Sequence, residues 1–223
     1  MKFVYPAINH VFDTDCDRVL SIVIENQGLL YELLCDVKQQ IEGKTGRSVV
    51  SIDGAIQPMD KTVELLYDYF PFILNKKSLL NKTATLLEKS ILEGEHYQEG
   101  LELLSAVESF FLKASFSFSN NINFSKISVS SLIKACGLEF VEDYDSLGEK
   151  IIDYFELVSE LEGNKLFILY NLRCVMSDSE TRAFLHTVLT HGYNVVMLES
   201  AIHPLLALEQ RFIVDVDLCE ISD

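Results

Sequence analysis

The chain has 223 residues, of which 48% are hydrophobic and 23% are charged, and its formal net charge at pH 7 is −16. So large an excess of acid excludes a surface that is basic all over, and on bulk charge alone nucleic acids and anionic membranes are poor partners. The composition is typical of a globular protein, and the length suits one large domain or a domain with an insertion. The longest uncharged apolar runs are far shorter than the ~20 residues of a membrane span, and the first residues form no apolar signal segment. We therefore expect a cytoplasmic protein without a membrane partner.

The first 57 residues predict a strand, a helix and a second strand. Val19–Ile24 is β-branched and almost wholly apolar, as in a strand that is covered on both faces. Apolar side chains then recur at helical spacing over Leu29–Ile41. Ser48–Ile52 predicts another short strand, and Asp53-Gly54 is expected to close it.

Residues 58–127 show a different pattern, in which one helix follows another. The expected helices run from Asp60 to Phe70, over about 76–92, and from Leu101 to Phe111. The stretch Ser115–Asn123 is rich in serine, asparagine and phenylalanine and is typical of a loop. We interpret residues 58–127 as an α-helical insertion.

The last third of the chain returns to alternating strands and helices. Its strongest signals for buried strands are Lys165–Tyr170 and Asn194–Glu199. The other expected elements are the helices Val129–Cys136, Leu147–Leu161, Ser179–Thr190 (capped by Ser177 or Asp178) and Pro204–Gln210, and the strand Arg211–Leu218. Strands separated by helices imply a parallel sheet covered on both sides. The sequence therefore predicts an α/β fold, with a mostly parallel core formed by residues 1–57 and 128–223 and a helical domain inserted at 58–127.

An α/β fold of this kind invites a search for a phosphate-binding loop, and the sequence does not contain one. The string Gly43-Lys44-Thr45 follows a helix and precedes a strand, which is the wrong order, and Lys38 stands where the motif needs its first glycine. At the correct place, after Ile24, the sequence reads Glu25-Asn26-Gln27-Gly28. A single glycine and a carboxylate that repels phosphate argue against binding of a nucleoside triphosphate there.

No other set of residues indicates catalysis, a metal or a cofactor, so we predict none of the three from the residues. Asn171 and His203 are typical of turns, and His186 and His191 lack a cysteine or carboxylate at helical spacing to complete a zinc site. The five cysteines are scattered and form no Cys-x-x-Cys pair, which predicts buried, reduced thiols. Because the members of a catalytic triad can lie far apart in a sequence, this argues against an enzyme without excluding one.

The distribution of charge is more informative than the total. Two segments contain lysines and no acid: residues 75–87, with Lys76, Lys77 and Lys82, and residues 109–138, with Lys113, Lys126 and Lys134. They total +6, which leaves −22 for the rest of the chain. On the helix expected over 76–92, one polar stripe is formed by Ser78, Lys82, Thr85 and Lys89. The stripe is either a solvated helix face or a strip that contacts DNA phosphates, and tight binding would need several copies around one duplex.

Several stretches together resemble the small adaptation protein of type II-A CRISPR loci, which is the accessory member of such a locus and not its nuclease. They are Val19–Ile24 with the helix Leu29–Ile41, the stretch Ser131–Gly137, and the run from Lys150 through Lys165–Asn171 to Asn194–Glu199. The length and the order of elements agree over nearly the whole chain.

The resemblance implies a core like that of phosphate-loop ATPases whose nucleotide site is lost, with a helical insertion. It also implies a non-catalytic homotetrameric ring with a basic channel that takes double-stranded DNA by its ends. The role would be spacer acquisition, alongside the integrase proteins and the effector nuclease of the locus. The lysines of the insertion are then the candidates for DNA binding: Lys76, Lys77, Lys82 and Lys89, and after them Lys113, Lys126 and Lys134.

Calcium is also implied by the resemblance, but here the sequence departs from the family. Family members carry an acidic cluster before the helix that matches Ser128–Cys136, whereas the corresponding stretch here, Ser119–Lys126, has no carboxylate. Because calcium is bound mostly by charged oxygen ligands, we expect at best weak binding there. We hypothesise that Lys126 replaces the charge of the cation.

Two other functions stay open at the level of the sequence. One is a diverged ATPase-like protein that still binds a nucleotide, which a melting shift with nucleotide would support. The other is a scaffold whose acidic surface binds proteins, which a monomer that ignores DNA would support.

Overall fold

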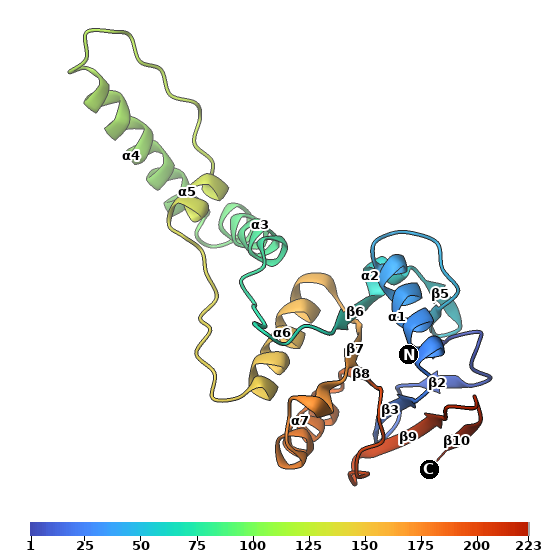
Figure 1. Ribbon diagram of the computed structural model, residues 1–223. Coiled ribbons are helices and arrows are strands. Elements are labelled where there is room, and N and C mark those ends of the chain that lie inside the picture. Colours follow the sequence, from blue (N-terminus) through green and yellow to red (C-terminus); the bar gives the residue numbers. More distant parts are fainter. Residues whose placement is uncertain (223) are drawn as a thin grey trace. The chain divides into compact units, whose positions relative to one another are not determined.

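The computed structural model describes residues 1–222, and the chain divides into two compact units (Figure 1). The α/β unit contains Met1–Phe72 and the chain from Asp143 onward, and the helical unit contains Ile73–Glu142. The described residues form seven α-helices and two sheets, one of them mostly parallel, which confirms the α/β class. Over residues 1–222, no helix combines the length and the apolar character that crossing a membrane requires.

A six-stranded sheet forms the centre of the α/β unit, in the order β10-β9-β3-β8-β7-β6. Its strands are β3 (Val19–Ile24), β6 (Val63–Leu66), β7 (Leu166–Tyr170), β8 (Asn194–Glu199), β9 (Glu209–Val214) and β10 (Glu220–Ser222). Neighbouring strands are parallel except β10, which pairs antiparallel with β9. Every residue of β3 is buried, as expected for a parallel strand covered on both faces. The predictions of β3, β7 and β8 are confirmed.

Helices cover both faces of this sheet. They are α1 (Gln27–Ile41), α2 (Met59–Thr62), α6 (Leu147–Glu162), the 3₁₀-helix η1 (Leu172–Cys174) and α7 (Asp178–His191). Leu33 of α1 belongs to one apolar core with Ile168 of β7. Phe167, the neighbour of Ile168, points to the opposite face and stacks on Phe155 of α6, with ring centroids 3.9 Å apart. Phe184 of α7 packs edge-on against Phe155, so α6 and α7 share that face.

The start of α7 confirms the cap expected at Ser177. The Ser177 hydroxyl accepts a hydrogen bond from the backbone N–H of Glu180, and the Glu180 carboxylate accepts one from the backbone N–H of Ser177. This capping box satisfies backbone donors that the first turn of a helix leaves unpaired. At the other end of α7, Gly192 has a φ of 68°, the left-handed conformation that favours glycine.

A second sheet is antiparallel and has the order β2-β1-β4-β5. Its strands are β1 (Lys2–Val4), β2 (Val11–Asp13), β4 (Val49–Ile52) and β5 (Ala55–Gln57). The strand expected over Ser48–Ile52 exists, but it belongs to this sheet and not to the parallel one. Asp53 and Gly54 both have positive φ and turn the chain from β4 into β5, as in a two-residue hairpin.

The helix expected from Asp60 to Phe70 is wrong for most of its length. Only α2 is helical, and β6 follows it directly. β6 pairs in parallel with β7, with Val63 opposite Leu166. Val63 and Leu66 are both buried, and apolar side chains three residues apart fit a helix face as well as this short strand. The pairing with β7 decides in favour of the strand.

Two other expectations differ from the structure. No helix forms over Pro204–Gln210, and β9 begins at Glu209 instead. The insertion was expected over 58–127, between core segments 1–57 and 128–223, whereas the helical unit runs from Ile73 to Glu142. The helical unit begins later than expected because β6 belongs to the core sheet. It ends later than expected because residues 140–142 form hydrogen bonds with the beginning of the helical unit.

The helical unit contains α3 (Lys77–Glu93), α4 (Tyr97–Ser115) and α5 (Val129–Ala135). Helix α3 packs against both α4 and α5. It buries Leu79 and Ala84, and α5 buries Val129, whereas α4 has no fully buried residue. The apolar face expected for α3 is therefore only partly covered, since Leu87 is 41% exposed.

Hydrogen bonds join the two ends of the helical unit, in what we call the Asn75–Glu142 clasp. Asn75 Nδ2 donates to the carbonyl of Phe140 (3.0 Å), and Asn75 Oδ1 accepts from the Phe140 N–H (2.7 Å). The Glu142 carboxylate accepts from the N–H groups of Leu74 (3.1 Å) and Asn75 (3.0 Å) and from Asn75 Nδ2 (2.8 Å). The chain therefore enters and leaves the helical unit at one place.

The carboxylate of Asp36 joins α1 to the start of β4. It accepts hydrogen bonds from the backbone N–H groups of Arg47 (2.7 Å) and Ser48 (2.8 Å) and from the side chains of Ser48 and Gln40. Partial burial by itself raises the pKa of Asp36, but the hydrogen bonds outweigh it and the pKa is lowered overall. A lowered pKa in the folded state stabilises the fold above the ordinary value of 3.8, and this contribution is lost as the pH falls through the folded value.

We expect D36N to lower the free energy of unfolding by about 1–2 kcal/mol at neutral pH, because an amide replaces a charged acceptor of four hydrogen bonds. The difference from wild type should shrink in acid, where the wild-type carboxylate also becomes protonated. Urea denaturation at neutral pH and at a pH well below the ordinary carboxyl pKa measures the loss of stability and its decrease in acid. D17N, at an exposed aspartate before β3, is the control and should have little effect. An equal loss for D36N at both pH values would contradict the assignment.

Candidate functional site

All seven candidate lysines lie on the helical unit, and all seven side chains are exposed. Lys76 precedes α3, Lys77, Lys82 and Lys89 lie on α3, Lys113 lies on α4, Lys126 lies between α4 and α5, and Lys134 lies on α5. The stripe of Ser78, Lys82, Thr85 and Lys89 is exposed along its whole length. All seven lysines, which span nearly 60 residues of sequence, therefore belong to one compact unit.

Several glutamates of the helical unit hold its own backbone. Glu88 of α3 accepts from the N–H of Ser130 (3.1 Å), Glu108 of α4 accepts from the N–H of Ile127 (3.3 Å), and Glu142 forms the clasp. With seven lysines and eight glutamates, this unit has a net charge of −1, so the α/β unit carries −15 of the total of −16. DNA would therefore meet far less repulsion at the helical unit than at the α/β unit.

The segment for which the family resemblance implies calcium does not fit that ion. Ser119–Lys126 offers amide and hydroxyl oxygens but no carboxylate, and its side chains are exposed. Calcium needs several oxygen ligands, most of them charged in tight sites. Within residues 1–222, three or more His, Cys, Asp or Glu side chains come close enough to hold a metal only at Cys174, Glu199 and His203.

The turn between β3 and α1, where a phosphate loop would lie, is closed by Asn26. Its Oδ1 accepts from the N–H of Leu29 (2.9 Å), and its Nδ2 donates to the carbonyl of Val216 (2.9 Å). The side chain therefore occupies the N-terminus of α1, where a phosphate would otherwise bind.

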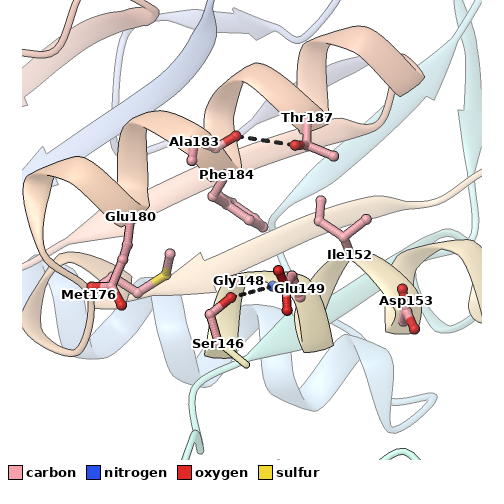
Figure 2. A pocket seen from close by; sticks show the side chains of 10 residues that line it. All are labelled: Ser146, Gly148, Glu149, Ile152, Asp153, Met176, Glu180, Ala183, Phe184 and Thr187. Carbon is pink, nitrogen blue, oxygen red and sulfur yellow. Dashed lines mark hydrogen bonds between the residues drawn. The ribbon is translucent and has the colours of Figure 1, made fainter. Parts of the chain in front are cut away.

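A groove of about 270 Å³ lies between α6 and α7, and Figure 2 shows Phe184 and Ile152 pointing toward each other across it. Its apolar lining comes from Ile152, Met176 and Phe184, and its carboxylates are those of Glu149, Asp153 and Glu180. Carboxylates from both helices repel phosphate and attract basic groups. The groove is therefore a poor nucleotide site and fits a positively charged segment of a protein.

A buried ionic network, centred on Arg173, lies at the carboxyl ends of β7 and β8. Arg173 Nη1 donates to Glu209 Oε1 (2.7 Å), and Nη2 donates to Asp178 Oδ1 (2.6 Å) and to the carbonyl of Pro204 (3.2 Å). Glu209 also accepts from the N–H of Leu206 (3.0 Å). The network joins η1, the start of α7 and the start of β9.

Glu199, the last residue of β8, is buried beside this network. Its Oε1 accepts from the N–H of Arg173 (3.2 Å), whereas its Oε2 faces His203 Nε2 at 3.8 Å. The Cys174 sulfur completes a group of three ligand atoms that all lie within 4.8 Å of one another. Burial raises the pKa of Glu199 to about 7, raises the pKa of the Cys174 thiol and lowers the pKa of His203.

Comparison with models of protein families gives a match described as CRISPR-associated protein (Cas_Csn2) over residues 40–218. The match covers most of the chain and includes the whole helical unit. The chain belongs to the Cas_Csn2 family. This is the family of the type II-A CRISPR adaptation protein, so the resemblance is confirmed and gives the chain a role related to CRISPR adaptation. Comparison with curated proteins gives no match.

Neither the Cas_Csn2 resemblance nor the sequence motifs pointed to the cluster of Cys174, Glu199 and His203. The expectation of buried thiols is wrong for Cys174, which is exposed, as are three of the other four cysteines. The turn role expected for Asn171 is confirmed, since its φ is 52° and its Oδ1 accepts from the N–H of Ser200 (2.8 Å). One available signal is that all three cluster residues follow or end the two best-predicted parallel strands, whose carboxyl ends meet at one edge of the sheet.

We expect R173M to lower the free energy of unfolding by about 3–5 kcal/mol, because it leaves Glu209 as a buried and unpaired charge. Urea denaturation followed by circular dichroism measures the loss. R182M removes the same charge from an exposed position on α7 and is the control, with an expected change within about 0.5 kcal/mol. A loss for R173M no larger than for R182M would show that the network contributes little.

Proposed function

We propose that this Cas_Csn2 chain binds the ends of double-stranded DNA as a non-catalytic homotetrameric ring during spacer acquisition. The observation that carries the proposal is the gathering of seven exposed lysines on a unit of net charge −1, in a chain whose remainder carries −15. The ring, its preference for ends and its partners, the integrase proteins and the effector nuclease of the locus, rest on the family likeness. The proposal that the core resembles a phosphate-loop ATPase that has lost its nucleotide site also rests on the family likeness.

Electrostatics supports a multimer rather than a single chain as the DNA-binding species. The lysines of one chain can neutralise only a few phosphates, and each neutralised phosphate adds only about −0.9 to the slope of log K against log salt. Several copies of the helical unit around one duplex would multiply these contacts. The acidic α/β units would at the same time repel DNA from other surfaces.

Exposed apolar side chains on the helical unit support self-association. They belong to α4 and to the segment that follows it: Leu103, Phe110, Leu112, Phe116 and Phe118, all at least half exposed. Leu103 and Phe110 lie seven residues apart on one face of α4, and an exposed apolar face of this kind marks an interaction site. A second copy of the chain is the partner that a homotetramer supplies.

We expect K76E/K77E/K82E to weaken binding of linear duplex DNA by about 100-fold or more, because it replaces three phosphate-attracting charges in each chain with repelling ones. Light scattering should give the same oligomer as wild type, since all three side chains are exposed. A gel-shift titration on linear and closed-circular duplex, at two salt concentrations, measures affinity, preference for ends and salt dependence together.

The control is K2E/K61E/R182E, which changes the net charge by the same amount at exposed positions of the α/β unit. It should bind DNA nearly as well as wild type if position, and not total charge, decides. If the lysine variant binds like wild type, or if both variants lose binding equally, the assignment of the DNA surface to the helical unit is wrong.

A second candidate function, docking of a basic protein segment, is favoured by the acidic groove between α6 and α7. It corresponds to a scaffold role and is compatible with partners in the same locus. A wild-type chain that is monomeric and does not retard linear DNA would favour it over the ring. A nucleotide-binding role has less support, because Asn26 occupies the N-terminus of α1.

A further inference from the structure

The cluster at the carboxyl edge of the parallel sheet brings together one sulfur, one oxygen and one nitrogen ligand atom. Cys174 ends η1, Glu199 ends β8, and His203 lies four residues farther on. Their ligand atoms lie within 4.8 Å of one another, and Glu199 Oε2 is 3.8 Å from His203 Nε2. All three residues belong to the α/β unit, so the cluster is separate from the lysines of the helical unit.

Two of these atoms are buried without a hydrogen-bond partner. Glu199 is 1% exposed, and both its Oε2 and His203 Nε2 are shielded from solvent and unpaired. A distance of 3.8 Å is too long for a hydrogen bond between them. Since a buried polar atom without a hydrogen-bond partner destabilises the fold, such a pair calls for an ion or a water between its members.

We propose that Cys174, Glu199 and His203 form a binding site for Zn²⁺. Thiolate, imidazole and carboxylate are the three kinds of ligand that zinc takes in proteins, and calcium or magnesium would not select a sulfur. Three atoms within 4.8 Å of one another always have a point that lies within about 2.8 Å of all three, so zinc bonds of about 2.0–2.3 Å need only small shifts.

The surroundings hold the ligands in place. Glu199 Oε1 accepts from the N–H of Arg173, which leaves Oε2 directed at the site. Arg211 Nη1 donates to the carbonyl of His203 (2.7 Å) and fixes that loop. Hydrogen bonds of this kind orient metal ligands and are a regular part of metal sites. Cys174 is exposed, so water can reach the fourth position of a tetrahedral zinc.

The charge balance of the region also favours a divalent cation. The groups around the site are the guanidinium of Arg173, which pairs with Glu209 and Asp178, the guanidinium of Arg211 on the carbonyl of His203, the carboxylate of Glu199, and the neutral phenol of Tyr69. With both guanidinium groups charged and the three carboxylates ionised, the region carries −1. A bound Zn²⁺ offsets this charge at the point where the buried carboxylate oxygen is unpaired.

Binding of Zn²⁺ alone to the full chain, freed of metal by a chelator and then dialysed, tests the proposal. Calorimetry should give one zinc ion per chain, and zinc should raise Tm. Cobalt(II) in its place should give the strong visible absorption of a tetrahedral site and a thiolate-to-cobalt charge-transfer band. C174S should abolish that band and weaken zinc binding by about tenfold or more, and H203Q should weaken binding similarly.

Matched controls use residues of the same types outside the cluster. C136S and H186Q change an exposed cysteine and an exposed histidine, and both variants should bind zinc like wild type. Because Cys174 is also exposed, C174S should fold normally, and circular dichroism verifies this. No binding of zinc, a cobalt spectrum that C174S leaves unchanged, or equal losses in the control variants would each overturn the site. None of these outcomes depends on DNA binding.

Discussion

The parallel pairing of β6 with β7 is the constraint on which the arrangement of this chain depends. Two parallel neighbours in a sheet cannot be joined by a tight turn and need a crossover connection. Here β6 ends at Leu66 and β7 begins at Leu166, so the whole helical unit and α6 lie within that one connection. The helical unit is thus an enlarged crossover of an α/β sheet, and its place in the chain follows from the sheet.

The two units also divide the charge of the protein. Helices of the helical unit expose lysines while several of their glutamates accept backbone hydrogen bonds, as Glu88 and Glu108 do. The α/β unit carries nearly all of the net negative charge, and its carboxylates line the groove between α6 and α7. The total of −16 is therefore a poor guide to partners, because it averages over two surfaces that differ in kind.

The elements that could be predicted from the sequence are those whose patterns are long and unambiguous. β3, β7 and β8 are continuous apolar runs, and α6 and α7 have helical spacing with clear caps. β6 could not be recognised, because Val63 and Leu66 are three residues apart, which fits one face of a helix, and only the pairing with β7 shows that they lie on opposite faces of a strand. β1, β2 and β5 have three residues each, too few for an alternation to show.

Of the two candidate sites, one could be located from the sequence and the other could not. Lysines on a polar stripe are visible from local spacing and charge, but these alone leave open a solvated helix face, and it is the resemblance to the family that makes the stripe a candidate DNA surface. Cys174 and Glu199 lie 25 positions apart, and only the adjacency of β7 and β8 brings them together. Contacts made by strand order cannot be read from a single sequence unless the order itself is known.

The Asn75–Glu142 clasp reduces the entropic cost that the long insertion would otherwise impose on the core. A long unstructured connection between β6 and β7 would lower stability through the entropy of loop closure. Because Asn75 and Glu142 already hold the ends of the helical unit together, the connection between β6 and β7 is effectively shortened to residues 67–74 and 143–165, and α6 orders much of the second stretch. Helices inside the clasp can therefore be lengthened, shortened or exchanged with little effect on the sheet, which makes the helical unit the part of this architecture that is free to vary in size.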